Sequence, residues 1–290
     1  MPVDPSDDGP DLIDIDVAPG VRLRALDWGG PDPAVVLLHP NGFCAGLYQP
    51  LAERLRRVAR PIAVDLRGHG ASSAPSGPDR YRFERLAADV VALLDGLGLR
   101  GVVGVGGSLG GAVAVLVDRL DPGRWSRLVL AEPVAFPAAE GTSGADNPMA
   151  AGARRRRDRF PDRTAVVDAY RDRPPLSRLA PEALEAYARW GTVEDGGGVR
   201  LACSPEVEAT VFEVSTGPDG AAAAWDHLPR LSAPTTILAG ADTFLPDIFA
   251  EQATRAGAEL VVVPGGHFVL HEDTARGVEL IERYALDADR

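Results

Sequence analysis

The 290-residue chain contains no lysine, only two cysteines and only 6% aromatic residues. All 30 basic residues are therefore arginine, which we attribute to biased codon usage rather than to function. Two cysteines, Cys44 and Cys203, are too few for a disulfide framework or a cysteine metal cluster. His267 and His271 are four residues apart, but no third ligand accompanies them on one helix. Because a dinucleotide-binding glycine pattern is also missing, we expect no metal and no other cofactor.

Long apolar runs and an excess of positive charge are missing as well. No apolar stretch approaches the ~18 residues of a membrane-spanning helix. Residues 1–16 are acidic and lack the basic and apolar regions of a signal peptide. The net charge of −12 provides no basic excess to neutralise phosphates. We therefore expect a cytoplasmic protein, monomer or homodimer, that binds a small molecule and neither nucleic acid nor membrane.

The order of the predicted elements indicates one α/β domain with an insertion. Residues 1–10 read as a disordered leader, and residues 12–17 and 21–28 as a strand hairpin. Short apolar runs then alternate with helical patterns, which is typical of a mostly parallel sheet covered by helices. The alternation stops over residues 133–233, which we interpret as a helical cap over the carboxyl ends of the strands. The predicted core is residues 11–132 and 234–290, with strands at residues 34–38, 61–64, 102–105, 127–131, 235–239 and 259–263.

The most informative motif is G-x-S-x-G at residues 106–110, between a predicted buried strand and a buried helix. This pattern is typical of a nucleophile elbow, in which a strained turn presents a serine Oγ to solvent. Gly106 and Gly110 would let strand and helix pass without a Cβ clash. The motif predicts Ser108 as a nucleophile.

A serine nucleophile needs a base and an oxyanion site. His267 follows a predicted strand through Pro264-Gly265-Gly266, so it is the candidate base, and His271 is expected to be exposed. His39 and His69 are expected to hold loops by hydrogen bonds. The oxyanion donors would be the backbone N–H of Leu109 and one from the 39–43 loop, Asn41 or Phe43, of which we favour Asn41.

Four motifs together resemble the α/β-hydrolase superfamily: His39-Pro-Asn-Gly, Asp65-Leu-Arg-Gly-His-Gly, Gly106-Gly-Ser-Leu-Gly-Gly and Pro264-Gly-Gly-His-Phe. The resemblance implies an eight-stranded, mostly parallel sheet with helices on both faces and a helical cap after the sixth strand. It also implies Ser108 as nucleophile, His267 as base and Leu109 as oxyanion donor.

The chain departs from the common pattern of that superfamily at three places. Pro40 and Gly107 stand where many members have glycine and histidine, and Gly107 would open the pocket floor. The acid that orients the base usually lies three residues past the glycine ending the strand after the cap. Here Asp242 is two residues past Gly240, and Glu132 at the end of the preceding strand competes with it. We favour Asp242 and keep Glu132 open.

These residues favour a carboxylester-hydrolase-like enzyme with a Ser-His-acid triad, acting on an ester, lactone or thioester of a small to medium organic substrate. Two alternatives are a C–C bond hydrolase or lyase/cyclase, and a non-catalytic ligand-binding member. Serine at the elbow argues against dehalogenases and epoxide hydrolases, which carry aspartate there. Gly107, Phe136 and Trp190 are the candidate substrate contacts, and the arginine run at residues 154–157 is interpreted as a solvated helix face.

Overall fold

The computed structural model describes residues 9–138 and 144–287. Of the predicted leader, residues 1–8 lie outside the described residues. Within the described residues, none of the helices is long and apolar enough to cross a bilayer.

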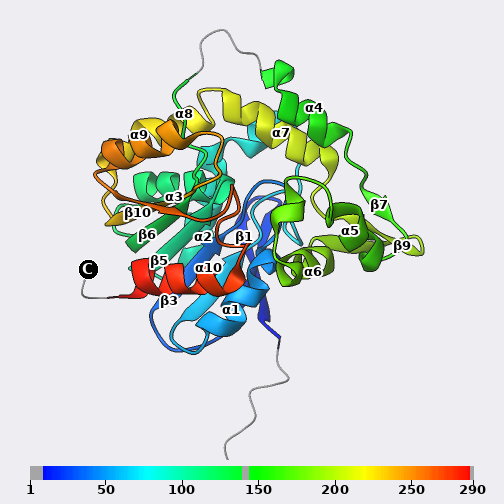
Figure 1. The fold of residues 1–290 in the computed structure, drawn as a ribbon, viewed down its shortest axis with the longest axis horizontal. Coiled ribbons are helices and arrows are strands. Elements are labelled where there is room, and N and C mark those ends of the chain that lie inside the picture. The colour runs from blue at the N-terminus through cyan, green and yellow to red at the C-terminus, as the bar shows by residue number, and fades with distance from the viewer. Residues whose placement is uncertain (1–8, 139–143, 288–290) are drawn as a thin grey trace, which may run out of the picture.

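An eight-stranded sheet forms the centre of the molecule, with the strand order β1-β2-β4-β3-β5-β6-β10-β11 (Figure 1). β1 and β2 form the predicted antiparallel hairpin, β2 pairs antiparallel with β4, and every pair from β4 to β11 is parallel. The predicted fold class is confirmed. The strands are β1 (Asp11–Ala18), β2 (Val21–Asp27), β3 (Ala34–Leu38), β4 (Arg60–Val64), β5 (Val102–Gly107), β6 (Trp125–Ala131), β10 (Thr235–Gly240) and β11 (Glu259–Val263).

Helices cover both faces of the sheet because its central strands are apolar on both sides. In β3, Val36 and Leu38 pack with α2 and α3, whereas Val35 and Leu37 pack with α1 and α10. Such continuous apolar runs are expected for parallel strands buried on both faces. The helices of these two layers are α1 (Gln49–Leu55), α2 (Phe83–Gly96), α3 (Leu109–Leu120), α8 (Ala221–His227), α9 (Pro246–Ala256) and α10 (Thr274–Ile281).

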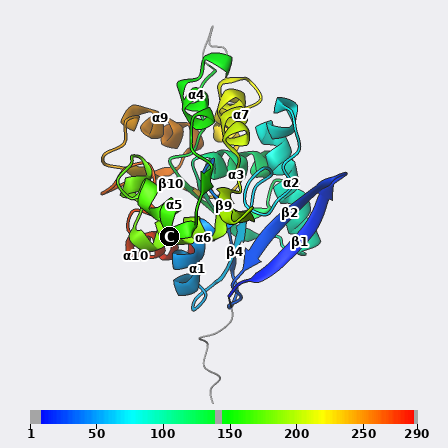
Figure 2. The ribbon, with the colours of Figure 1, turned by 90° about the vertical axis from the view of Figure 1, so that its right-hand side faces the viewer.

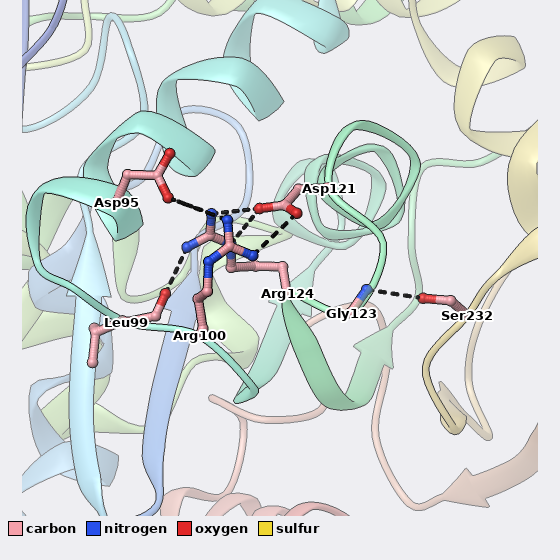
Figure 3. Close-up of polar contacts among 7 residues, drawn as sticks. All are labelled: Asp95, Leu99, Arg100, Asp121, Gly123, Arg124 and Ser232. Atoms are coloured by element: carbon pink, nitrogen blue, oxygen red, sulfur yellow. Dashed lines mark hydrogen bonds and ion pairs between the residues drawn. The ribbon is translucent and has the colours of Figure 1, made fainter.

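Arg124 joins the elements at the amino ends of β5 and β6 (Figure 3), whereas Ser108 follows the carboxyl end of β5. Its buried guanidinium donates to Leu99 O (2.6 Å) and to the carboxylates of Asp95 (2.5 Å) and Asp121 (2.8 Å). The planar fork of arginine suits several oxygen acceptors at once. This network ties the ends of α2 and α3 to the start of β6.

The elements from α4 to α7, which lie between β6 and β10 in the chain, form a cap on the side that faces the viewer in Figure 2. Its apolar centre packs on Phe43, Leu47 and Phe268, which lie in the loops that follow β3 and β11. The cap therefore covers the carboxyl ends of the strands. Its elements are α4 (Pro148–Arg154), β7 (Arg159–Phe160), α5 (Arg163–Tyr170), α6 (Pro181–Trp190), β8 (Thr192–Asp195), β9 (Gly198–Leu201) and α7 (Pro205–Thr216).

The cap differs from the prediction in two respects. It is not purely helical, because β7, β9 and β8 form a small sheet. Gly196 and Gly197, both with positive φ, turn the β8–β9 hairpin, and alternate side chains of β9 are buried. Ala224 and Trp225 of α8, which lie inside the predicted cap range of residues 133–233, also pack in the apolar cluster between the sheet and α3.

Candidate active site

Ser108 lies in the sharp turn between β5 and α3. Its backbone has φ 53° and ψ −115°, a conformation that non-glycine residues rarely adopt. Neighbouring backbone holds it there: its N–H donates to Ala131 O (2.9 Å), and its carbonyl accepts from Val134 N–H (3.0 Å). A Cβ on Gly110 would lie 2.0 Å from Leu38 O, so helix and strand could not approach this closely with any other residue at 110.

His267 contacts Glu132. Its Nδ1 lies 2.7 Å from Glu132 Oε2, which places the Nδ1 proton on that hydrogen bond. The second carboxylate oxygen of Glu132 accepts from Gly240 N–H at 2.8 Å. The Glu132 side chain is 1% exposed and the His267 side chain 26% exposed. Both oxygens of the buried Glu132 carboxylate thus accept a hydrogen bond, and this carboxylate orients His267. The Nε2 atom of the ring remains available to accept a proton.

Asp242, the acid that we favoured from the sequence, has a different partner. Its Oδ2 pairs with Arg178 of the cap at 2.7 Å, and its side chain is 62% exposed. Its backbone N–H donates to Gly265 O. Within the described residues, the carboxylate that contacts His267 is that of Glu132. The preference for Asp242 that we drew from the sequence does not match this geometry. The reason is that Asp242 leaves the sheet beyond Gly240, whereas Glu132 turns inward at φ 44° directly after β6.

The order of the strands explains how these residues meet. Ser108, Glu132 and the loop to His267 follow β5, β6 and β11, and β10 separates β6 from β11. The His267 loop crosses the end of β10 closely, because a Cβ on Gly240 would lie 2.4 Å from the carbonyl oxygens of Gly265 and Gly266. Glycine at position 240 thereby lets the loop reach Glu132.

The candidate oxyanion donors lie in the loop after β3, which contains Asn41 and Phe43, and at the start of α3, which contains Leu109. Phe43 N–H donates to Pro40 O (3.3 Å), and Gly42 N–H donates to His69 Nε2 (3.1 Å). The backbone N–H groups of Phe43 and Gly42 thus already have acceptors. This favours the backbone N–H of Asn41 over that of Phe43 as the oxyanion donor. Leu109 is the first residue of α3, where a backbone N–H has no partner within the helix.

His39 and His69 hold loops, as expected. His39 Nε2 accepts from Leu66 N–H (3.0 Å), and His69 Nδ1 donates to Arg67 O (3.0 Å). Burial lowers the pKa of His69 to about 4 and that of His39 well below its usual value, so both rings are neutral acceptors at neutral pH.

The expectation that His271 is exposed is wrong. His271 is 2% exposed, packs edge-on against Tyr48 with ring centroids 4.7 Å apart, and burial lowers its pKa to about 3. Neither of its ring nitrogens has a hydrogen-bond partner among the described residues.

The predicted substrate contacts lie in different environments. A Cβ on Gly107 would have ordinary contacts with Pro40 and the Tyr48 hydroxyl, so this floor admits a small side chain. Phe136 is half-buried in the segment that follows Glu132. Trp190 donates to Gln49 Oε1 (2.6 Å) and packs on Gly46, which explains its burial by packing between cap and core.

Two features near His267 went unnoticed in the sequence. Glu272 accepts from the backbone N–H groups of Gly266 (2.9 Å) and Phe268 (3.2 Å), on either side of the histidine. The exposed Phe244 ring lies 6.5 Å from the His267 ring, centroid to centroid. The only available signal was that Glu272 lies five residues after His267, which does not predict a carboxylate turned back onto the loop.

The fold and these contacts define an α/β hydrolase with serine at its elbow. Residues 35–280 match the alpha/beta hydrolase family, so the chain belongs to that family. It is 28% identical over 242 residues to 3-oxoadipate enol-lactonase 2 of Acinetobacter baylyi, covering 77% of each chain. It is 32% identical over 179 residues to 2-hydroxymuconate semialdehyde hydrolase of Pseudomonas putida, covering 59% of this chain and 63% of that protein.

Several other matches, including those to epoxide hydrolases, cover less than half of the length of those proteins. Among solved structures, E-2-(acetamidomethylene)succinate hydrolase is similar with a TM-score of 0.81 and 23% identity, covering 96% of this chain and 99% of that one. At this identity the likeness concerns the fold. The family match and the named relatives together support a hydrolase of the α/β-hydrolase fold.

Proposed function

We propose that the protein is a serine hydrolase that cleaves an ester, lactone or thioester of a small to medium organic acid. The observation that carries this proposal is the 2.7 Å contact between His267 Nδ1 and the buried Glu132, beside the strained turn of Ser108. The lactonase named above, which is 28% identical over 77% of this chain, supports a small organic acid as the acyl part.

The proposed reaction begins with attack by Ser108 Oγ on the substrate carbonyl carbon. His267 Nε2 takes the serine proton, and Glu132 stabilises the resulting imidazolium through the Nδ1–H bond. The N–H groups of Leu109 and Asn41 donate to the developing oxyanion. When the bond to the leaving group breaks, His267 returns the proton to that group and an acyl-enzyme remains on Ser108.

Water completes the cycle. His267 accepts a proton from water, the hydroxyl oxygen attacks the acyl carbon, and the Ser108 Oγ leaves with that proton. The products are the free acid and the regenerated serine. Every step uses residues of this chain and no cofactor.

The direct test is labelling with a fluorophosphonate followed by peptide mass spectrometry. We expect one adduct, on Ser108, and none in the Ser108→Ala variant. Hydrolysis of 4-nitrophenyl esters is expected to fall at least ~10³-fold in that variant. An unlabelled Ser108 in folded protein, or unchanged ester hydrolysis in the Ser108→Ala variant, would refute the proposal.

Hydrolysis of a C–C bond is the second candidate, because the 2-hydroxymuconate semialdehyde hydrolase is 32% identical over 59% of this chain. It would use the same serine and histidine. Parallel assays with esters and with β-diketone-type substrates distinguish the two, since each reading predicts a higher kcat/KM for its own substrates. The third reading, a non-catalytic ligand-binding member, loses support because Glu132 does contact His267.

A further inference from the structure

The arginine run after α4 is not the uniform solvated face that we expected from the sequence. Arg154, Arg155 and Arg157 are exposed, whereas the side chain of Arg156 is 16% exposed. Its Nη2 lies 3.0 Å from Oε2 of Glu208 in α7, whose side chain is 11% exposed. One member of the run therefore points inward, into the cap.

The hydrogen bonds of this buried pair are incomplete. Arg156 Nε and Nη2 are buried and, among the described residues, have no hydrogen-bond partner. Glu208 Oε2 is in the same state, so the 3.0 Å contact is an ion pair without hydrogen-bond alignment. A buried guanidinium N–H without an acceptor loses its hydration and gains nothing in return. The two donors lie on one edge of the guanidinium, which fits the two oxygens of a carboxylate.

Arg156 is not needed to hold α4 against α7. Arg154 already does so on the outside, with hydrogen bonds to Glu206 (2.9 Å, from both Nε and Nη2) and to Glu213 (2.6 Å). The outer pairs have full hydrogen-bond geometry, whereas the inner one does not. This contrast argues against a purely structural role for Arg156.

The buried pair adjoins the candidate oxyanion loop. Glu208 Oε1 lies against Gly42, where an added Cβ would be only 2.7 Å away. The backbone carbonyl of Glu208 accepts from Asn41 Nδ2 at 3.0 Å. The Tyr187 hydroxyl donates to Gly42 O at 3.4 Å. The Arg156 charge is thus one side chain away from the loop that contains the candidate oxyanion donor.

We propose that Arg156 is the anion-binding residue of the substrate site and that the acyl part of the substrate carries a carboxylate. The Nε–H and Nη2–H groups would donate to the two oxygens of that carboxylate while the carbonyl to be attacked lies at Asn41 and Leu109. Among the described residues, Arg156 differs from the buried Arg67 and Arg124 because its Nε and Nη2 lack a hydrogen-bond acceptor, so it can still take an anion. This inference rests on the proposed function and refines its substrate class.

The activity test compares two esters with the same number of acyl carbons, mono-4-nitrophenyl glutarate and 4-nitrophenyl pentanoate. The measured quantity is the ratio of kcat/KM for the charged ester to that for the neutral ester. We expect Arg156→Gln to lower this ratio about 100-fold and Arg156→Lys to lower it about 10-fold, because lysine keeps the charge but not the paired donors. Arg155→Gln is the matched control, since it removes the same charge from the exposed neighbour and should leave the ratio within twofold.

A binding test keeps the inference separate from catalysis. In the Ser108→Ala background, glutarate is expected to raise Tm and the neutral amide pentanamide to raise it less. The glutarate shift should disappear when Arg156→Gln is added. If Ser108 proved unreactive but the Arg156-dependent shift remained, the proposed function would fail and the anion site would stand.

The inference is overturned if Arg156→Gln lowers kcat/KM equally for both esters, since that is the result of a structural role. It is also overturned if glutarate shifts Tm equally with and without Arg156. Should Arg156→Gln not fold, the kcat/KM ratio in Arg156→Lys and the inhibition of the unaltered protein by glutarate and by neutral pentanamide decide the matter. Equal inhibition by glutarate and pentanamide then contradicts the proposal.

Discussion

At the scale of single residues, the candidate site depends on which carboxylate orients His267. Glu132 is buried, accepts two hydrogen bonds and contacts the ring, whereas Asp242 is exposed and pairs with Arg178. An exposed ion pair contributes little, whereas a buried acceptor fixes the tautomer of its histidine. The two acids should therefore respond very differently to loss of charge.

We expect Glu132→Gln to lower kcat/KM for 4-nitrophenyl esters by about 10²- to 10⁴-fold, because an amide no longer stabilises the imidazolium. Asp242→Asn is the matched control and should change kcat/KM by less than about threefold. Steady-state kinetics on both variants, with far-UV circular dichroism to verify folding, measures the difference. Equal losses in the two variants would contradict the role assigned to Glu132.

At the scale of elements, the loop of His267 is held by Glu272, which lies just before α10 (Thr274–Ile281). Glu272 is 7% exposed, and its two oxygens accept from the N–H groups of Gly266 and Phe268. Arg178 of the cap donates to the same carboxylate at 3.0 Å and to Asp242 at 2.7 Å. The cap and the histidine loop therefore share one ion-pair network, and Glu272 positions His267 without touching substrate.

Glu272→Ala should lower kcat about 10-fold with little change in KM, because it frees the loop but leaves the substrate contacts intact. Glu279→Ala, on the exposed side of α10, is the control and should leave kcat unchanged. A parallel fall in Tm and in the fraction of active protein, with kcat per active site unchanged, would point to a structural role instead. Titration of active sites with a fluorophosphonate separates these outcomes.

At the scale of the whole molecule, buried histidines make the free energy of unfolding depend on pH. Burial lowers the pKa of His271 to about 3, well below its usual 6.5. The unfolded chain therefore binds a proton on the His271 ring more tightly than the folded chain does. The contribution of the neutral ring to the free energy of unfolding is fully present above pH 6.5 and is lost as pH falls toward 3. Asp65 acts in the opposite direction, because burial raises its pKa to about 6.

We expect His271→Leu to reduce the pH dependence of stability by roughly 1 kcal/mol per pH unit between pH 6 and 4. At pH 7.5 the variant should be no less stable than the original, since it removes two ring nitrogens that lack partners in the described structure. Urea unfolding at pH 7.5, 6, 5 and 4 measures both effects. An unchanged slope would show that His271 does not titrate in this window.

Local sequence patterns predicted much of this fold and part of its candidate site. The residues of β3 and β11 were predicted to the residue, because each is a short, largely apolar run followed closely by proline. The hairpin of β8 and β9 was missed because its strands are only four residues long. Helix α8 lies in the predicted cap range of residues 133–233 but packs on the core, because its apolar residues suit either environment.

The sequence by itself determined the turn at Ser108, the loop of His267 and the loop of Asn41. Each of these turns and loops depends on glycines or on a turn within a few residues of the chain, so the neighbouring residues in the sequence are sufficient to predict it. Only the tertiary structure decided that Glu132 meets His267, that Arg156 turns inward and that His271 is buried. These outcomes depend on which strand ends lie side by side and on how the cap packs over them, and no spacing along the chain contains that information.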